Sequence, residues 1–318
     1  MSKFDPYRHL SIVPNPDGTI TRCLDLPRTE ANPNIIPGIP TVSKDVTLND
    51  ETKVWARIFL PNKLPSNDNT VVRLPILFYF HGGGFILFSV SNTSTHQPCS
   101  TFASEIPAIV VGVEHRLAPE HRLPAIYEDA IDAILWVKKQ ALNPDGERWL
   151  RDYGDFTRCY LGGRGSGGNI AFHAALKAMD YDIKPLNING IFLNQPMFGG
   201  VQRMPSELKY ATDQLIPLPV LDLMWELALP KTTDRDHRYC NPMEDDVYMS
   251  KASSLGRCLV ISFDRDPMFD RAQEFVRKLV EQKVQVDARF DIMGFHNIDL
   301  VDQQRAQAVL NIIKEFII

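Results

Sequence analysis

An acid and a histidine near the end of the chain each follow a segment that reads as a strand. Asp266 stands just after the run Leu259–Phe263, and His296 stands after Val284–Phe290. A histidine that is oriented by a carboxylate can act as a general base toward a hydroxyl, a water or a carbon acid. Taken singly, each residue is more often a solvated acid or a surface histidine. Together, each at the end of a strand-like run, they predict a catalytic dyad.

A glycine-rich segment follows an earlier apolar run. The sequence His81-Gly82-Gly83-Gly84-Phe85 comes directly after Leu74–Phe80. Three glycines let backbone N–H groups face a cavity without side chains in the way. Such donors stabilise an oxyanion when they are fixed where the negative charge develops. A plain glycine-rich turn is the alternative, and a phosphate-binding loop is disfavoured because no Gly-Lys-Ser/Thr sequence follows.

The segment at 159–173, CYLGGRGSGGNIAFH, predicts a third chemical element. We expect a strand that ends at Leu161, a sharp glycine-dense turn, and a helix from near Gly168 to about Met179. A strand, a sharp turn and a helix in this order place a catalytic serine in the frame Gly-x-Ser-x-Gly. The segment is therefore expected to be a nucleophile elbow.

The nucleophile itself is missing from that frame. Gly163 and Gly167 match the two flanking glycines, but the central residue is Gly165. The only hydroxyl of the turn belongs to Ser166, one position late. Because glycine has no side chain, an acyl-enzyme at residue 165 is excluded.

Alternating strands and helices must position these residues. The pattern predicts an α/β fold, a largely parallel central sheet with helices on both faces in one domain of residues 1–318. The expected strands are Val42–Leu48, Val54–Leu60, Leu74–Phe80, Ile106–Val113, Ile188–Leu193, Leu259–Phe263 and Val284–Phe290. The expected helices, besides that of the elbow, are Ala125–Gln140, Val220–Leu229, Arg271–Gln282 and Asp302–Ile317.

Two segments interrupt the alternation. Residues 1–45 are polar and rich in proline, yet Tyr7, Leu10, Ile12 and Val13 are apolar enough to pack over the domain. Residues 197–250 hold several prolines and many charges between two expected strands. We expect both segments to form a cap, although the first could instead be a loosely ordered arm.

The composition limits the classes of partner that the protein could bind. The 318 residues carry a formal net charge of −5, which argues against nucleic acid or an anionic membrane as partner. No run of about 18 apolar residues could span a membrane, and no signal peptide is evident. The five cysteines are scattered and odd in number, as expected for reduced thiols in a cytoplasmic protein. No metal cluster or cofactor fingerprint is apparent, and the oligomeric state is left open.

Several segments resemble one family closely. They are FYFHGGGFILFS at 78–89, VEHRLAPEHRLPAIYEDA at 113–130, the elbow, RDHRYCNP at 235–242, DPMFDR at 266–271 and GFH at 294–296. With these segments the chain resembles the plant carboxylesterase family, the hormone-sensitive-lipase-like branch of the α/β-hydrolases. The resemblance implies an α/β-hydrolase fold whose cap covers a pocket for small, largely apolar metabolites or their esters.

The resemblance also implies roles for single residues. Gly83, Gly84 and the backbone N–H of Ser166 would form the oxyanion hole, and Asp266 would orient His296.

The chain departs from the family at the elbow. Members usually read Gly-Glu/Asp-Ser-Ala-Gly-Gly-Asn, where this chain has Gly-Arg-Gly-Ser-Gly-Gly-Asn at 163–169, and His115 stands where tyrosine is common. Arg164, His115 and Phe85 are therefore candidate pocket residues.

Three functions are compatible with a dyad and an oxyanion hole that lack the serine. The first is a lyase, cyclase or isomerase in which His296 removes a proton and the glycine loop stabilises the anion. The second is a carboxylesterase that acts through activated water or through Ser166. The third is a small-molecule receptor without catalysis, which the retained Asp266 and His296 disfavour. The missing serine favours the first of these.

Overall fold

Eight strands form one central sheet in the computed structural model, which describes residues 4–67 and 70–318. Their order is β12-β11-β10-β9-β7-β8-β4-β3. All pairs from β12 to β8 are parallel, whereas β4 pairs antiparallel with both β8 and β3 at one edge. The strands are β3 (Thr41–Asn49), β4 (Val54–Pro61), β7 (Leu74–Phe80), β8 (Ile109–Glu114), β9 (Gly154–Arg164), β10 (Ile188–Asn194), β11 (Arg257–Phe263) and β12 (Gln285–Asp291). The predicted α/β-hydrolase sheet is confirmed.

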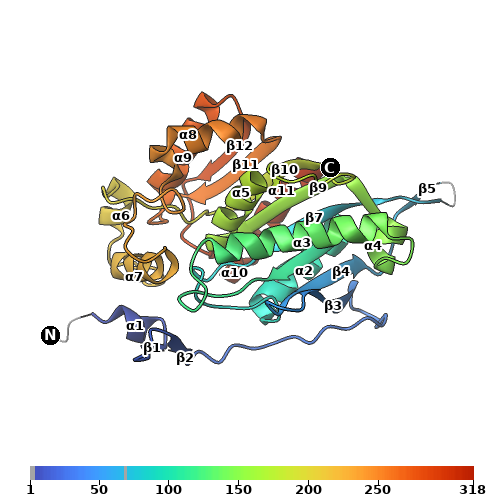
Figure 1. Cartoon of the computed structure of the whole chain (residues 1–318), viewed down its shortest axis with the longest axis horizontal. Coiled ribbons are helices and arrows are strands. Elements are labelled where there is room, and N and C mark those ends of the chain that lie inside the picture. Colours follow the sequence, from blue (N-terminus) through green and yellow to red (C-terminus); the bar gives the residue numbers. More distant parts are fainter. Residues whose placement is uncertain (1–3, 68–69) are drawn as a thin grey trace.

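Helices cover both faces of this sheet, and Figure 1 shows α3 and α5 running across one of them. The larger apolar core includes side chains of α3, α5 and α9, and a second core on the other side includes those of α2 and α11. The helices are α2 (Thr93–Glu105), α3 (Ala125–Leu142), α4 (Arg148–Tyr153), α5 (Ser166–Ala178), α8 (Asp246–Ser250), α9 (Phe269–Glu281), α10 (Ile298–Val301) and α11 (Gln303–Ile317). Each sheet face therefore has its own core.

Most predicted elements agree with the structure within a few residues, but several details were wrong. Strand β9 continues to Arg164 rather than ending at Leu161, and α5 begins at Ser166 rather than near Gly168. The elbow is thus tighter than expected, with one residue between strand and helix. Helix α2 was not predicted, and Ile106–Ala108 precede β8 instead of belonging to it.

The cap consists of the N-terminal arm and two helices of the 197–250 segment, α6 (Pro205–Lys209) and α7 (Leu218–Ala228). The arm contains α1 (Pro6–His9) and a hairpin of β1 (Ile12–Pro14) and β2 (Ile20–Arg22). In Figure 1 the arm passes along one side of the domain, with α1 next to α7, a pair that is also in contact.

Side chains of the arm anchor it to the domain. Leu10 and Ile12 are buried as predicted, whereas Val13 is 51 % exposed and does not pack. Arg22 donates to the carbonyl oxygens of Ile86 (2.6 Å) and Ala118 (2.7 Å). The arm is therefore held against the loop that follows the three glycines.

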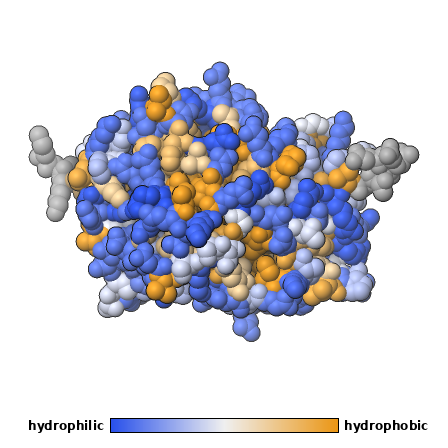
Figure 2. All heavy atoms as spheres, turned by 90° about the horizontal axis from the view of Figure 1, so that it is seen from above, coloured by the Kyte–Doolittle hydropathy of each residue, from blue (hydrophilic) through white to orange (hydrophobic). Residues whose placement is uncertain are grey.

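The surface carries both hydrophilic and hydrophobic side chains. Figure 2 shows one face on which hydrophilic side chains dominate and hydrophobic ones form smaller clusters. Among the residues that the structure describes, no helix is both long and apolar enough to cross a bilayer. All five cysteines are free thiols, as predicted.

Candidate active site

The sharp turn between β9 and α5 is made by a single residue. Gly165 has φ 56° and ψ −122°, a conformation that strains any residue with a side chain. Its N–H donates to the carbonyl oxygen of Asn194 (2.9 Å), and its carbonyl oxygen accepts from the N–H of Met197 (2.9 Å). These bonds hold the elbow geometry at Gly165 itself, so the position that a nucleophile would occupy is 165 and not 166.

The missing side chain would point at the predicted base. A Cβ atom built on Gly165 lies 4.0 Å from both Cε1 and Nε2 of His296. A hydroxyl one bond further would come within hydrogen-bond reach of Nε2, about 2.6–3.2 Å. A serine side chain at residue 165 would therefore be placed to form a hydrogen bond with His296.

His296 and Asp266 are joined by a hydrogen bond, which is the arrangement that a catalytic dyad requires. Nδ1 of His296 lies 2.8 Å from Oδ2 of Asp266, and both side chains are buried. The other carboxylate oxygen accepts from the N–H of Met268 at 2.9 Å. A carboxylate can only accept, so Nδ1 carries the proton and Nε2 is left as the basic nitrogen facing the cavity.

Gln195, which the sequence interpretation missed, fixes this dyad. Its Nε2 donates to Asp266 Oδ2 (2.9 Å) and to the carbonyl oxygen of Phe295 (3.1 Å). Its Oε1 accepts from the N–H of Asn297 at 3.0 Å. Gln195 therefore connects the acid to the residues on both sides of His296. No pattern in the sequence signals this role, since Gln195 merely follows a buried strand.

The glycine loop presents its backbone to the same cavity. Gly83 and Gly84 have φ values of 105° and 61°, which side chains rarely adopt. A Cβ on Gly83 would lie 2.3 Å from the carbonyl oxygen of Leu87, and one on Gly84 would lie 2.3 Å from Met224 Sδ. Glycine is therefore required at both positions.

The predicted oxyanion donors are available. Within the described part of the chain, the N–H groups of Gly83, Gly84 and Ser166 donate to no protein acceptor. All three residues line one cavity. Their assignment as an oxyanion hole stays a prediction that this arrangement permits.

Ser166 is placed as the first residue of α5. It is 1 % exposed, and its Oγ has no hydrogen-bond partner among the described residues. In particular, no hydrogen bond links it to His296. A route through Ser166 as the nucleophile would need the elbow to refold.

Arg164 turns toward the segment after the histidine. Its guanidinium forms an ion pair with Asp299 (2.5 Å), which also accepts from the side-chain amide of Asn194 (2.8 Å). Burial acts to lower the pKa of Arg164, but the nearby carboxylate of Asp299 outweighs it and the pKa is raised. Arg164 also lines the cavity, as predicted.

Two other candidates lie away from the cavity. Phe85 is fully buried against Trp225, with ring centroids 5.2 Å apart. His115 stacks on His81 at 4.1 Å, and its Nδ1 pairs with the carbonyl oxygen of Arg116. Neither is part of the lining, whereas His81 is. We correct both from pocket residues to packing residues: their side chains support the loop from behind.

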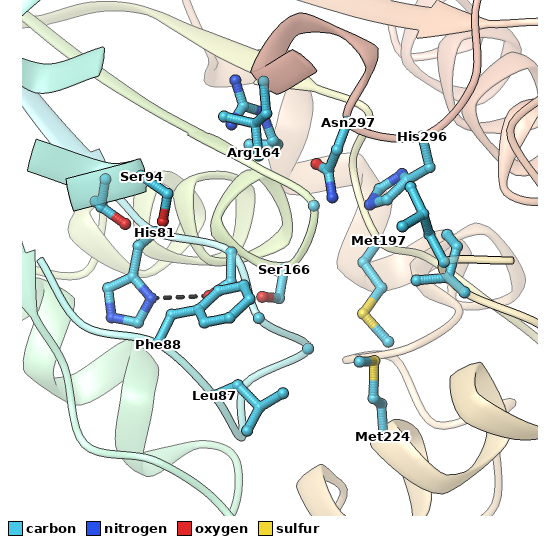
Figure 3. A pocket seen from close by; sticks show the side chains of 18 of the residues that line it. His81, Leu87, Phe88, Ser94, Arg164, Ser166, Met197, Met224, His296 and Asn297 are labelled. Atoms are coloured by element: carbon cyan, nitrogen blue, oxygen red, sulfur yellow. Dashed lines mark hydrogen bonds between the residues drawn. The ribbon is translucent and has the colours of Figure 1, made fainter. Parts of the chain in front are cut away.

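The cavity that joins these groups measures about 210 Å³. Figure 3 shows His296, Asn297 and Arg164 on one side of it, with Met197 and Met224 below the histidine. The apolar part of the lining comes largely from the cap and adjoining loops, namely Leu10, Leu87, Phe88, Met197, Leu215, Ile216, Leu221, Met224 and Met268. No group of three His, Cys, Asp or Glu in the described ranges is arranged to hold a metal ion. The site suits a small apolar molecule with one polar reacting group.

Comparison with known proteins agrees with this geometry. A family with the alpha/beta hydrolase fold matches residues 77–299. The protein named "Probable carboxylesterase 9" of Arabidopsis thaliana is 53 % identical over 99 % of this chain and 97 % of its own length. This chain belongs to the plant carboxylesterase family.

Other carboxylesterases are similar over nearly their full length. A 3-O-acetylpapaveroxine carboxylesterase of Papaver somniferum is 44 % identical over 98 % of this chain and 99 % of its own. Among solved structures, an esterase of Pyrobaculum calidifontis has a TM-score of 0.72 and 25 % identity, covering 86 % of this chain and 84 % of its own. Family membership and fold are thus established.

Proposed function

We propose that this protein is a carboxylesterase in which His296 activates water directly, without an acyl-enzyme intermediate. The observation that carries the proposal is the elbow at Gly165, which has the strained turn conformation but offers no hydroxyl. A Cβ built on Gly165 would lie 4.0 Å from Nε2 of His296. A water within reach of Nε2 could lose its proton to the imidazole as it attacks an ester carbonyl. The backbone donors of the glycine loop and of Ser166 would hold the resulting oxyanion.

The substrate class follows from the cavity and the relatives. A cavity of about 210 Å³ with an apolar cap suits a compact acyl group on an apolar molecule. The Papaver somniferum relative is named for an acetyl ester. We therefore infer short-chain esters of small plant metabolites as substrates.

A lyase, cyclase or isomerase is the second candidate. The same base and the same donors could remove a proton next to a carbonyl and stabilise the enolate. The absence of a nucleophile at Gly165 favours this chemistry as much as direct hydrolysis. Hydrolysis is preferred because the relatives similar over nearly the whole chain are named carboxylesterases.

Turnover of 4-nitrophenyl acetate by the purified protein and by His296→Ala tests the proposal. We expect hydrolysis in the unchanged protein, a loss of about 10²–10⁴-fold in the variant, and no mass increase of the protein during turnover. An acetylated protein, or equal rates in both proteins, would contradict it. No turnover of esters together with a changed metabolite profile would favour the second candidate.

A further inference from the structure

A second cavity adjoins the one that contains His296. It measures about 540 Å³ and lies between α2 on one side and α10 and α11 on the other. We call it the α2–α11 groove. Ser94, Arg164 and Leu300 line both the groove and the active-site cavity. In Figure 3, Arg164 and Ser94 lie on the side of the active-site cavity away from Met224, so the groove adjoins the site on that side.

The boundary between the two spaces is open at its outer part. Ser94 is a small, exposed residue at the start of α2, and Leu300 is 42 % exposed. No layer of buried side chains therefore separates the groove from the active-site cavity at this point. A molecule bound in the site can extend past these two residues into the groove.

The groove is on the side of the site where a leaving alcohol must lie. Helix α10 begins at Ile298, two residues after His296, so one wall of the groove continues the loop that carries the base. During hydrolysis Nε2 of His296 returns its proton to the oxygen of the leaving alcohol, which must lie within hydrogen-bond reach. The alcohol part of the ester is thus next to this loop, and the cavity of about 210 Å³ is left for the acyl group.

The lining of the groove is apolar where it is buried and polar where it is exposed. The buried apolar part is Phe102, Val309 and Leu310, and the exposed polar part is Ser94, Gln97, Thr101, Asp302 and Gln303. A volume of about 540 Å³ lies within the range of about 300–1,000 Å³ that is usual for ligand pockets. The groove therefore suits a ring system with apolar faces and oxygen atoms at its edge.

The charges beside the groove favour a neutral molecule. The cation of Arg164 is already paired with Asp299, which is buried and also lines the groove. An anion bound here would lie close to the Asp299 carboxylate. Nη1 of Arg164 donates to no acceptor among the described residues, so it can still donate to a neutral oxygen.

We propose that the α2–α11 groove binds the alcohol part of the ester, and that this part is a neutral, oxygen-bearing group of about two or three fused rings. The inference rests on the proposed function, because an ester substrate has a leaving alcohol only if the protein hydrolyses it. It adds the chemical class of that alcohol and the residues that select it.

Kinetics on two acetate esters tests the assignment. Resorufin acetate and 4-nitrophenyl acetate share the acetyl group, but resorufin has three fused rings and nitrophenol has one. Thr101→Trp and Ala306→Trp fill the groove from its two walls, and neither residue lines the active-site cavity. We expect kcat/KM for resorufin acetate to fall about tenfold in both variants, with little change for 4-nitrophenyl acetate.

The exposed Asn311→Trp on α11, outside both cavities, is the matched control and should change neither rate. Thermal melting verifies that the variants are folded. An equal loss for the two esters, or no loss for resorufin acetate in either folded variant, would overturn the assignment while leaving hydrolysis intact.

Equilibrium dialysis tests the groove without any turnover. Chromone-2-carboxamide and chromone-2-carboxylate have the same ring system, but only the second is charged. We expect the carboxamide to bind about tenfold more tightly than the carboxylate, and Ala306→Trp to weaken its binding about tenfold. Tighter binding of the carboxylate, or unchanged binding in Ala306→Trp, would overturn the proposal. Absence of all ester turnover in the unchanged protein would instead refute the proposed function, and dialysis would still decide whether the groove binds such rings.

Discussion

Arg164 at the end of β9 and Asp299 in α10 form a buried ion pair across the site. The side chains are 12 % and 2 % exposed, and Nη2 of the arginine lies 2.5 Å from Oδ2 of the acid. Asn194 at the end of β10 donates to the same carboxylate oxygen. The pair thus links the residue before Gly165 to the segment that follows His296. The arginine in the elbow therefore has a buried acid as its partner.

Loss of Arg164 should destabilise the fold. Arg164→Met leaves the Asp299 carboxylate buried without its cation, and breaking such a pair typically costs about 3–5 kcal/mol of unfolding free energy. Arg164→Met combined with Asp299→Leu should recover much of this loss, because no buried charge is then unpaired. Urea unfolding measures the unfolding free energy of the single and of the double variant. The exposed Arg277→Met is the control, and we expect it to lower the unfolding free energy by less than about 1 kcal/mol. A double variant as unstable as the single one would be evidence against the pairing.

Asp266 should act through the histidine. Asp266→Asn keeps the size of the side chain but favours the wrong imidazole tautomer, so kcat should fall by about 10⁴-fold while KM changes little. Steady-state kinetics on 4-nitrophenyl acetate gives both values. If kcat of the variant stays within tenfold of that of the unchanged protein, His296 oriented by Asp266 is not the base.

Stability should fall in mild acid because of buried histidines. Burial lowers the pKa of His81 and of His115 from 6.5 to about 4, and for His115 the neighbouring His81 adds to the lowering. Between these values the unfolded chain takes up protons that the folded chain does not. Stability is therefore retained above pH 6.5 and lost as the pH falls toward 4, with a slope of about 1.4 kcal/mol per pH unit for each histidine.

His115→Tyr tests this pH dependence, since it removes one of the two histidines that take up a proton on unfolding. Urea midpoints between pH 7 and about pH 4.5 should fall less steeply in the variant than in the unchanged protein. Other buried histidines, such as His173, are present in both proteins, so their contributions to the slope cancel when the two are compared. Equal slopes would show that His115 titrates alike in the folded and unfolded states.

Much of the fold could be predicted because several of its strands are continuous apolar runs. Leu74–Phe80 is buried along its whole length, and its predicted and observed bounds coincide. Helix α2 escaped notice because Thr93–Glu105 is weakly apolar and contains Pro98. Its buried positions, such as Thr95, Cys99 and Phe102, nevertheless follow helical spacing, so the signal was present.

Residues of the site could be predicted only where their type restricts them to a few chemical roles. The placement of Asp266 and His296 after strands identified the dyad, and their mutual hydrogen bond agrees with it. Gln195 and Asn297 could not be found this way, because their positions depend on contacts between the end of β10 and a loop about 100 residues later. Phe85 was misplaced because glycine-loop neighbours can face either the cavity or the core, and here Phe85 packs on the cap helix α7.

The central claim is that the site is complete except for the side chain at residue 165. Gly165→Ser tests it most directly, by the rate of 4-nitrophenyl acetate hydrolysis and by covalent labelling with a serine-directed phosphonate. The account predicts a rate increase on the order of 10³-fold and a label on the peptide that contains residue 165, with none on the unchanged protein. A folded variant that hydrolyses no faster and takes no label, or an unchanged protein labelled at Ser166, would contradict it.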